Sequence, residues 1–305
     1  MPGTHRNLEN TPVRVVSARV GLGRRLANLW SRRELLGGLI VSDIRIKYKG
    51  SALGFVWSML APALTLTTYF LVFSVLLKNG VPNFALYLFS GLVVWNFFQN
   101  AVTAATGVIV DRAALVKKVA FPREILPLAN VGSAAVYFVS QLTVLVAFMA
   151  VTGHAPDWGW LPLLPLSFIA LYLFTAGVAM VVSALTVYLR DVKHLMEVAL
   201  QLWFWATPIV YSYENAIAAP LHRHGLATLY FLNPLALIVL TFQRVFYVAT
   251  TVTSTTASAS LHVLPSWPYS TFLEVNLGLI AVMLVFFLVA EAVFGRLEEN
   301  FESTL

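Results

Sequence analysis

Residues 161–189, LPLLPLSFIALYLFTAGVAMVVSALTVYL, contain no charged side chain. A hydrocarbon core of ~30 Å is crossed by about 20 helical residues, so this stretch predicts a transmembrane helix. Five further apolar stretches accompany it, and we place them at 53–77, 84–110, 125–151, 195–211 and 271–294. We therefore expect an all-α integral membrane protein with six transmembrane helices.

The lysines and arginines are sorted between alternate gaps of this pattern. Of the 20, ten fall in residues 1–52, four in 111–124, two in 190–194 and one, Arg296, in the C-terminal tail. The opposite gaps hold only Lys78, Arg223 and Arg244. Short loops rich in Lys and Arg remain on the cytoplasmic side. We therefore expect a multi-pass bacterial inner-membrane protein whose N- and C-termini are both cytoplasmic.

Composition excludes several other classes of protein. Apolar residues make up 59% of the chain and charged ones 11%, whereas soluble proteins have about half and about a quarter. The alternating segments of about ten residues that are typical of an outer-membrane barrel are missing from the sequence. The net charge of +6 follows the loops, so no nucleic-acid partner is expected. Without cysteine there are no disulfides and no thiolate metal sites.

The sequence carries no catalytic or nucleotide-binding motif. The phosphate-binding loop G-x-x-x-x-G-K-[ST] is missing, as are H-E-x-x-H, D-x-D and G-x-S-x-G. His222 and His224 have no acidic neighbours, so we expect no metal and no cofactor in this chain. Glu274 and Glu291 lie near the ends of the last span, whereas ion-coupled transporters bury charge near mid-membrane. The energy source is left unexplained within this polypeptide, and an ion-coupled or passive transporter acting alone stays a further alternative. A membrane glycosyltransferase stays an alternative, although the short loops lack its acid/base pairs.

The N-terminal region divides into two parts. Residues 1–28 contain five arginines and no apolar core, so we expect a mobile basic arm and no cleavable signal. Residues 29–52 alternate apolar and basic positions at helical spacing, which predicts an amphipathic helix in the membrane interface. This helix either anchors the chain to lipid or shapes a cytoplasmic entrance for a substrate.

The fifth span is short, and a second apolar run follows it. Residues 226–249 are interrupted by Asn233-Pro234 and carry Gln243 and Arg244. If this run crossed the membrane, residues 250–270 would be cytoplasmic, but they contain no Lys or Arg. We therefore expect 213–270 to be external, with re-entrant or external gate helices, within a permease domain of 53–294 that precedes a cytoplasmic tail, 295–305.

Three stretches join these spans in a recognisable order. They are RIKYKGSALGFVWSMLAP (45–62), DRAALVKKVAFPREILPLAN (111–130) and YLRDVKHLMEVALQLWFWATPIVYS (188–212). Gly50 and Gly54 allow the sharp turn into the first span, and Pro122 ends a short basic helix. At these stretches the chain resembles the permease subunits of ABC transporters that export lipid-linked polysaccharides, such as O-antigen, capsule, teichoic-acid and galactan exporters.

The resemblance implies a set of partners. It implies a homodimer of six-span subunits with two copies of a separate cytoplasmic ATPase, which would bind ATP and Mg. The cargo would be a polysaccharide attached to a polyprenyl pyrophosphate, in contact with membrane lipids. A related exporter of drugs or other lipids is the alternative in this class. The longer N-terminal arm and the Thr/Ser-rich stretch 250–260 depart from the family pattern.

Two sets of site residues come with the resemblance. The loop between the second and third spans would form a coupling helix against the ATPase; the matching residues are Asp111, Arg112, Lys117, Lys118, Phe121, Pro122, Arg123 and Glu124. Alternatively, their basic members only fix orientation. Aromatic side chains on the first, second and fifth spans would line a glycan conduit: Trp57, Trp95, Phe97, Phe98, Trp203, Phe204 and Trp205. Alternatively, these rings face lipid or the membrane interface.

Basic residues near the first span form a third candidate set. Arg45, Lys47, Tyr48 and Lys49 could hold the pyrophosphate of the carrier at the cytoplasmic surface. Arg24, Arg25, Arg32 and Arg33 carry the same charge, and attraction to anionic lipid headgroups is the competing explanation for the whole set.

Overall fold

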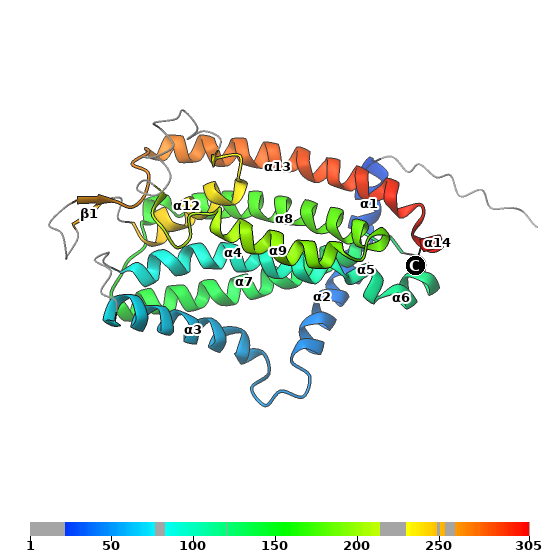
Figure 1. Cartoon of the computed structure of the whole chain (residues 1–305), viewed down its shortest axis with the longest axis horizontal. Helices are drawn as coiled ribbons and strands as arrows, with labels where there is room; N and C mark the ends of the chain where they lie inside the picture. The colour runs from blue at the N-terminus through cyan, green and yellow to red at the C-terminus, as the bar shows by residue number, and fades with distance from the viewer. Residues whose placement is uncertain are drawn as a thin grey trace, which may run out of the picture.

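The computed structural model describes residues 22–76, 83–119, 121–213, 230–248, 251–253 and 260–304. Nearly all regular structure in these ranges is helical, which confirms the expected fold class. Five described helices are long and apolar enough to cross a membrane, and they run along the long axis of one bundle (Figure 1). They are α3 (Trp57–Tyr69, continued by the π-helical segment η2, Phe70–Leu76), α4 (Phe84–Thr106), α7 (Ile125–Thr152), α8 (Leu163–Tyr188) and α13 (Tyr269–Glu298).

The fifth expected span is shorter than its predicted range. Residues 195–211 correspond to α9 (Val192–Trp205), whose 14 residues cover about 21 Å of the ~30 Å core. The helix stops before Pro208, because the residue ahead of a proline is driven out of the helical region. Helix α9 nevertheless packs beside α4 and α8 in the bundle (Figure 1).

The N-terminal helices lie crosswise to the bundle. Helix α1 (Leu22–Ser31) and helix α2 (Arg33–Lys47) run roughly perpendicular to the long helices, as expected of helices in a membrane interface (Figure 1). Ile40 of α2 rests on Gly132 of α7, where a Cβ atom would overlap the Ile40 side chain. After α2 the chain turns into η1 (Gly54–Val56) and α3 through Gly50 and Gly54, both with positive φ.

Helix α12 (Pro234–Phe246) sits at the opposite end of the bundle and contacts α4, α8 and α13. Its 13 residues span about 20 Å, too short to cross the membrane. Pro234 occupies its first turn, and the Asn233 side chain accepts a hydrogen bond from the Leu235 N–H at 3.1 Å. This geometry favours the re-entrant or external alternative over a seventh span.

A short antiparallel ladder accompanies α12. Strand β1 (Thr251–Thr253) pairs with β2 (Ser260–His262), placing Val252 opposite Leu261. The Thr/Ser-rich stretch 250–260 was expected to be external, but no strand was predicted there. A 3₁₀ turn, η3 (Trp158–Trp160), precedes α8 and packs against α12.

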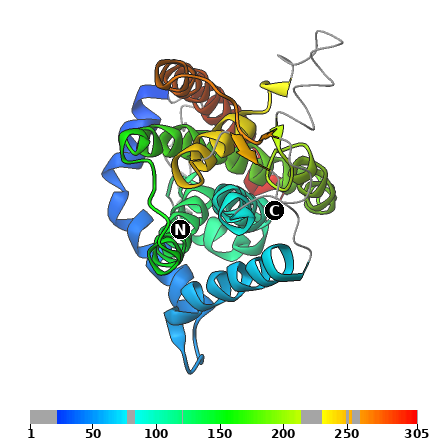
Figure 2. The same ribbon diagram turned by 90° about the vertical axis from the view of Figure 1, so that its left-hand side faces the viewer.

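The described chain begins and ends on one side of the bundle. Helix α1, the short helices α5 (Val108–Asp111) and α6 (Ala113–Lys118), and the terminal helix α14 (Phe301–Thr304) share this end (Figure 1). Viewed from the other end, α4 occupies the middle of the bundle (Figure 2). Its Tyr87, Phe97 and Phe98 are fully buried, because α4 packs against α7, α8, α9 and α12.

Candidate functional site

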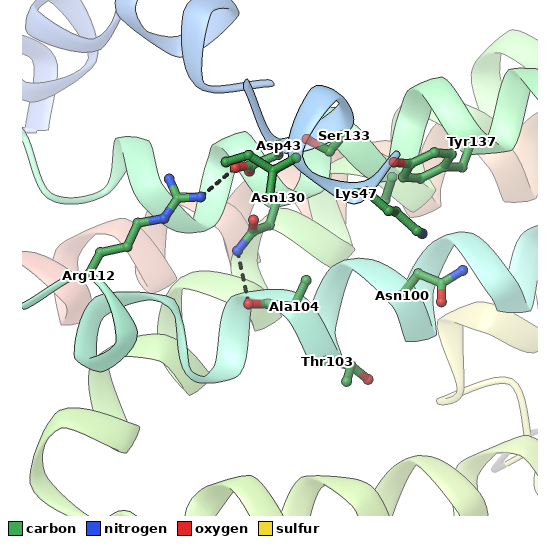
Figure 3. A pocket seen from close by; sticks show the side chains of 11 residues that line it. Asp43, Lys47, Asn100, Thr103, Ala104, Arg112, Asn130, Ser133 and Tyr137 are labelled. Atoms are coloured by element: carbon green, nitrogen blue, oxygen red, sulfur yellow. Dashed lines mark hydrogen bonds and ion pairs between the residues drawn. The ribbon is translucent and has the colours of Figure 1, made fainter. Parts of the chain in front are cut away.

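Two adjoining cavities form a groove along α4 and α7, beside α2 and α3. One has a volume of about 450 Å³ and the other about 400 Å³, within the usual range of ligand pockets. Both are lined by Lys47, Asn100 and Tyr137, so we treat them as one feature, the polar groove (Figure 3). It begins at the end that carries α1 and α14 and extends along the bundle towards Gln141 and Thr65.

Lys47 lies where the two cavities meet. Its Nζ sits 4.1 Å from the centre of the Tyr137 ring, a cation–π contact. The ion pairs among the described residues do not include Lys47. Burial lowers the pKa of the Lys47 amine, because the surroundings replace water around its charge. Tyr48 packs edge-on against Phe55 and Tyr137 and thus fixes the rim of the groove.

The wall of the groove consists of amides and hydroxyls. Asn96 donates to Gln141 Oε1 at 2.9 Å, joining α4 to α7. Asn130 donates to the Ala104 carbonyl at 2.9 Å. Asn100 and Thr103 present exposed side chains from α4, and the Ser133 hydroxyl is buried without a described partner. Polar groups at this depth mark a water-filled or ligand-filled space, since lipid cannot satisfy them.

Arg112 connects the groove to the expected coupling segment. It donates a hydrogen bond from Nη2 to Asp43 Oδ1 of α2, and both side chains line the groove (Figure 3). Asp43 is thereby held by Arg112, while its other oxygen is buried with no described partner. The first end of segment 111–124 is thus attached to the interfacial helix.

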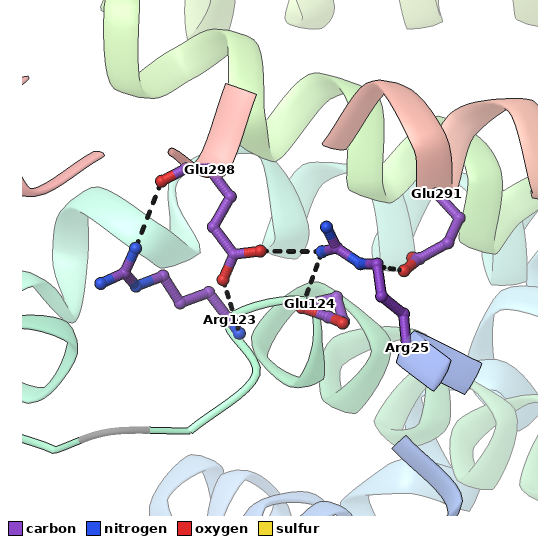
Figure 4. Close-up of polar contacts among 5 residues, drawn as sticks. All are labelled: Arg25, Arg123, Glu124, Glu291 and Glu298. Carbon is purple, nitrogen blue, oxygen red and sulfur yellow. Dashed lines mark hydrogen bonds and ion pairs between the residues drawn. The ribbon is translucent and has the colours of Figure 1, made fainter. Parts of the chain in front are cut away.

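The second end of that segment enters a buried ion network (Figure 4). Arg25 of α1 contacts Glu291 at 2.9 Å, Glu298 at 2.7 Å and Glu124 at 3.3 Å. Arg123 donates from Nη1 to the Glu298 carbonyl at 3.2 Å. A Cβ atom at Gly295 would overlap the Arg25 guanidinium, so only glycine leaves it this path.

Three carboxylates around Arg25 make the network rich in negative charge. Burial first, and then the Glu298 and Glu291 carboxylates, raise the pKa of Glu124 to about 7, although Arg25 opposes the shift. Burial alone would lower the pKa of Arg25, but the three carboxylates raise it above its ordinary value. Glu124 is therefore partly protonated near neutral pH.

The coupling residues separate into two groups. Asp111, Lys117 and Lys118 are exposed, and α6 projects beyond the bundle (Figure 1). Arg112, Arg123 and Glu124 instead face inward and hold the segment in place, and the Phe121 ring packs on the core next to half-buried Pro122. The exposed surface of α6 also presents Leu115 and, just after the helix, Val119, which sequence reasoning did not select.

The aromatic residues predicted to line the conduit differ in how far they are buried. Trp95, Phe97 and Phe98 are at most 3% exposed and form an internal aromatic core in which Phe98 stacks on Phe174 at 5.4 Å. Trp203 and Phe204 are half-buried, and the Trp203 indole N–H donates to Asn233 at 2.9 Å. Trp57 and Trp205 are exposed at 42% and 60%. Of this set, only the last two present an open ring to a passing molecule in this conformation.

The residues predicted to hold the carrier pyrophosphate also fall into two groups, those that line the groove and those that do not. Lys47 and Tyr48 line the groove, whereas Arg45 and Lys49 line neither cavity, although all three basic side chains are exposed. Arg25 is engaged with carboxylates and is not free to hold a phosphate. Arg24, Arg32 and Arg33 are exposed on α1 and α2 or the turn between them. His222, His224, Lys78, Arg223 and the arm up to residue 21 lie outside the described residues.

Sequence reasoning missed the polar wall of the groove, although a signal was present. Asn96, Asn100 and Thr103 follow helical spacing on one face of the second span. Asn130, Ser133, Tyr137 and Gln141 do the same on the third. A polar stripe on an otherwise apolar span indicates a face that lipid does not cover.

The sequence pattern of the ABC-2 type transporter family fits residues 35–247. The chain belongs to this family. Two Klebsiella pneumoniae proteins named O-antigen export system permease protein RfbA are each 30% identical to this ABC-2 type chain over 219 residues, 72% of it and 82% of the relative. A Myxococcus xanthus protein of the same name is 32% identical over 224 residues, 73% of this chain and 84% of the relative. The protein is a multi-pass membrane transporter component.

Proposed function

We propose that this chain is the permease subunit of an ABC transporter that exports a polysaccharide linked to polyprenyl pyrophosphate across the bacterial inner membrane. A separate cytoplasmic ATPase, present in two copies, supplies the energy, and two copies of the chain form the permease. The ends of the chain and segment 111–124 face the cytoplasm. The similarity to O-antigen export permeases over most of the chain supports the choice of cargo.

The contacts that attach α6 to the rest of the chain support coupling to the ATPase. This helix projects from the bundle, and the segment around it is attached on one side to α2 through Arg112–Asp43. On the other side Glu124 binds Arg25 of α1, and Arg123 binds the end of α13. A push on α6 by an ATPase therefore reaches the interfacial helices and the last span together. Rigid helices joined by ion pairs are contacts through which coupling between distant sites can be carried.

The groove and the exposed rings supply the substrate side. Lys47 supplies a positive charge in the groove, at the end of α2, and would meet the phosphates of the carrier there. Trp57 and Trp205 offer open aromatic faces on α3 and α9, and such faces stack on the C–H faces of sugar rings. Trp95, Phe97 and Phe98 support this surface from behind by packing α4 in place.

The test replaces Lys117 and Lys118 of α6 together by glutamate. Both side chains are exposed, so the variant should insert and fold like the parent. We expect co-purification of the ATPase to fall about tenfold or more, and glycan export to fall with it, because two attractive charges become repulsive. Arg296→Glu is the control, a charge reversal of half that size on an exposed residue at the same end. Unchanged co-purification and export in the double variant would reject coupling through α6.

A further inference from the structure

We infer that each subunit holds one phosphate-linked glycan head in its own polar groove, with the phosphate at Lys47 and the first sugars along Asn96, Asn100 and Gln141. The identity of this amphiphile rests on the proposed function. The site itself rests on the geometry of the groove. The lining residues belong to α2, α3, α4 and α7, together with Arg112 and Tyr48.

The charge balance of the groove favours an anion. The charged lining residues are Lys47, Arg112 and Asp43, which leaves one positive charge in excess. Arg112 already neutralises Asp43, so the Lys47 ammonium has no described carboxylate partner. The Lys47 side chain is exposed in the groove and its ammonium contacts the Tyr137 ring. Such an ammonium gains a charge-assisted contact from a phosphate oxygen.

The amide wall suits a hydroxyl-rich group next to that phosphate. Asn96 and Asn100 lie one helical turn apart on α4, and Gln141 faces them from α7. Each amide offers both a donor and an acceptor, as sugar hydroxyls require. The Asn100 side chain is exposed in the groove and makes no hydrogen bond to the described residues. It is therefore available to the first sugar.

The outer side of the groove suits an apolar chain. Helix α3 and the turn before it expose Phe55, Val56 and Leu64 on the surface of the subunit. A polyprenyl tail attached to a phosphate at Lys47 would lie along these side chains and remain in lipid. Each part of the ligand thus has a matching part of the groove. Lys47 would contact the phosphate, the amide wall would contact the sugar hydroxyls, and the apolar outer side would contact the polyprenyl chain.

The test is a binding measurement on the purified chain in nanodiscs of zwitterionic lipid, without ATPase or nucleotide. The probes are undecaprenyl pyrophosphate, the same lipid carrying one N-acetylhexosamine, and phosphatidylglycerol. Native mass spectrometry counts the molecules bound per chain. We expect one polyprenyl pyrophosphate per chain, hence two per dimer, and weaker binding of phosphatidylglycerol, which brings one phosphate and no sugar.

Variants locate the site within the groove. Lys47→Gln should weaken both polyprenyl probes about tenfold or more, since it removes a charge-assisted contact. Lys47→Arg should retain binding, which excludes misfolding as the cause. Lys49→Gln is the matched control, because Lys49 is exposed two residues away and lines neither cavity. Asn100→Ala should weaken only the sugar-bearing probe.

Three results would overturn the inference: equal losses for Lys47→Gln and Lys49→Gln, phosphatidylglycerol binding as tightly as the polyprenyl probes, or one molecule per dimer. Because no ATPase is present, these results are independent of export. Intact export with no binding at Lys47 would reject this site alone, and binding without ATPase-dependent export would reject the proposed function alone.

Discussion

Gly295 controls whether Arg25 can reach its three carboxylates. A side chain at this position would occupy the space of the guanidinium, so we predict that Gly295→Val expels Arg25 and leaves Glu291 and Glu298 unpaired. Losing one partner of a buried ion pair costs about 3–5 kcal/mol. Thermal unfolding in detergent, followed by tryptophan fluorescence, measures the loss. Gly278→Val on the same helix meets open space and should change stability by less than about 1 kcal/mol. Equal effects would contradict the prediction.

The raised pKa of Glu124 makes stability depend on pH. Its pKa of about 7 in the folded chain exceeds the ordinary 4.5, so the folded state keeps a proton that the unfolded chain releases. Stability should therefore fall as pH rises from about 4.5 to about 7 and then level off, by up to about 3 kcal/mol. Glu124→Gln should flatten this slope, whereas Glu299→Gln, on an exposed residue, should keep it. Unfolding scans at several pH values compare the slopes, and parallel curves for parent and Glu124→Gln would disprove the effect.

At the residue scale, the sequence identified the residues of the coupling segment but not the residues that they contact. Arg123 and Glu124 belonged to the expected coupling set, but their partners lie on α1 and α13, far away in the chain. Glu291 is 266 residues from Arg25, and no local pattern joins them. The same holds for Asp43, which meets Arg112 across 69 residues. Helical periodicity locates a face, but packing decides what that face touches.

At the element scale, the seating of α2 on α7 depends on Gly132. We predict that Gly132→Leu pushes Ile40 away and loosens α2, at an overpacking cost of about 1–3 kcal/mol. A single cysteine at Ser133, which is buried beside this contact, reports the change. Its labelling should be about fivefold faster or more in the Gly132→Leu background. Gly38→Leu on α2 meets nothing within 4 Å and should leave the rate unchanged.

Hydropathy predicted the long helices well, because an apolar run of 20 or more residues has few other structures open to it. Hydropathy was less informative where the apolar segment is short. The end of α9 depends on Pro208, and α12 is distinguished from a span only by its length of 13 residues. The ladder of β1 and β2 has three residues a strand, too few for a pattern. Hydropathy also could not tell which of the Trp and Phe rings face the interior, because apolar side chains are accepted by both lipid and core.

At the scale of the whole molecule, the orientation in the membrane can be tested directly. The chain has no cysteine, so each introduced cysteine is unique. We predict that Lys118→Cys in α6 reacts with an impermeant maleimide only from the cytoplasmic side. Ser254→Cys, in the expected external region, should react only from the opposite side. Labelling of Ser254→Cys from the cytoplasm alone would require a seventh crossing and would reverse the assignment of the last span.

The contacts of Asn233 join two helices that the sequence separates. Its side chain accepts from the Trp203 indole and donates to the Ala206 carbonyl at 3.1 Å and to Thr207 Oγ1 at 3.1 Å. The start of α12 is thus hydrogen-bonded to the end of α9, whose first turn follows Arg190 and Asp191. Asn233 therefore ties the position of α12 to that of α9, and a tilt of α9 would move the start of α12 with it.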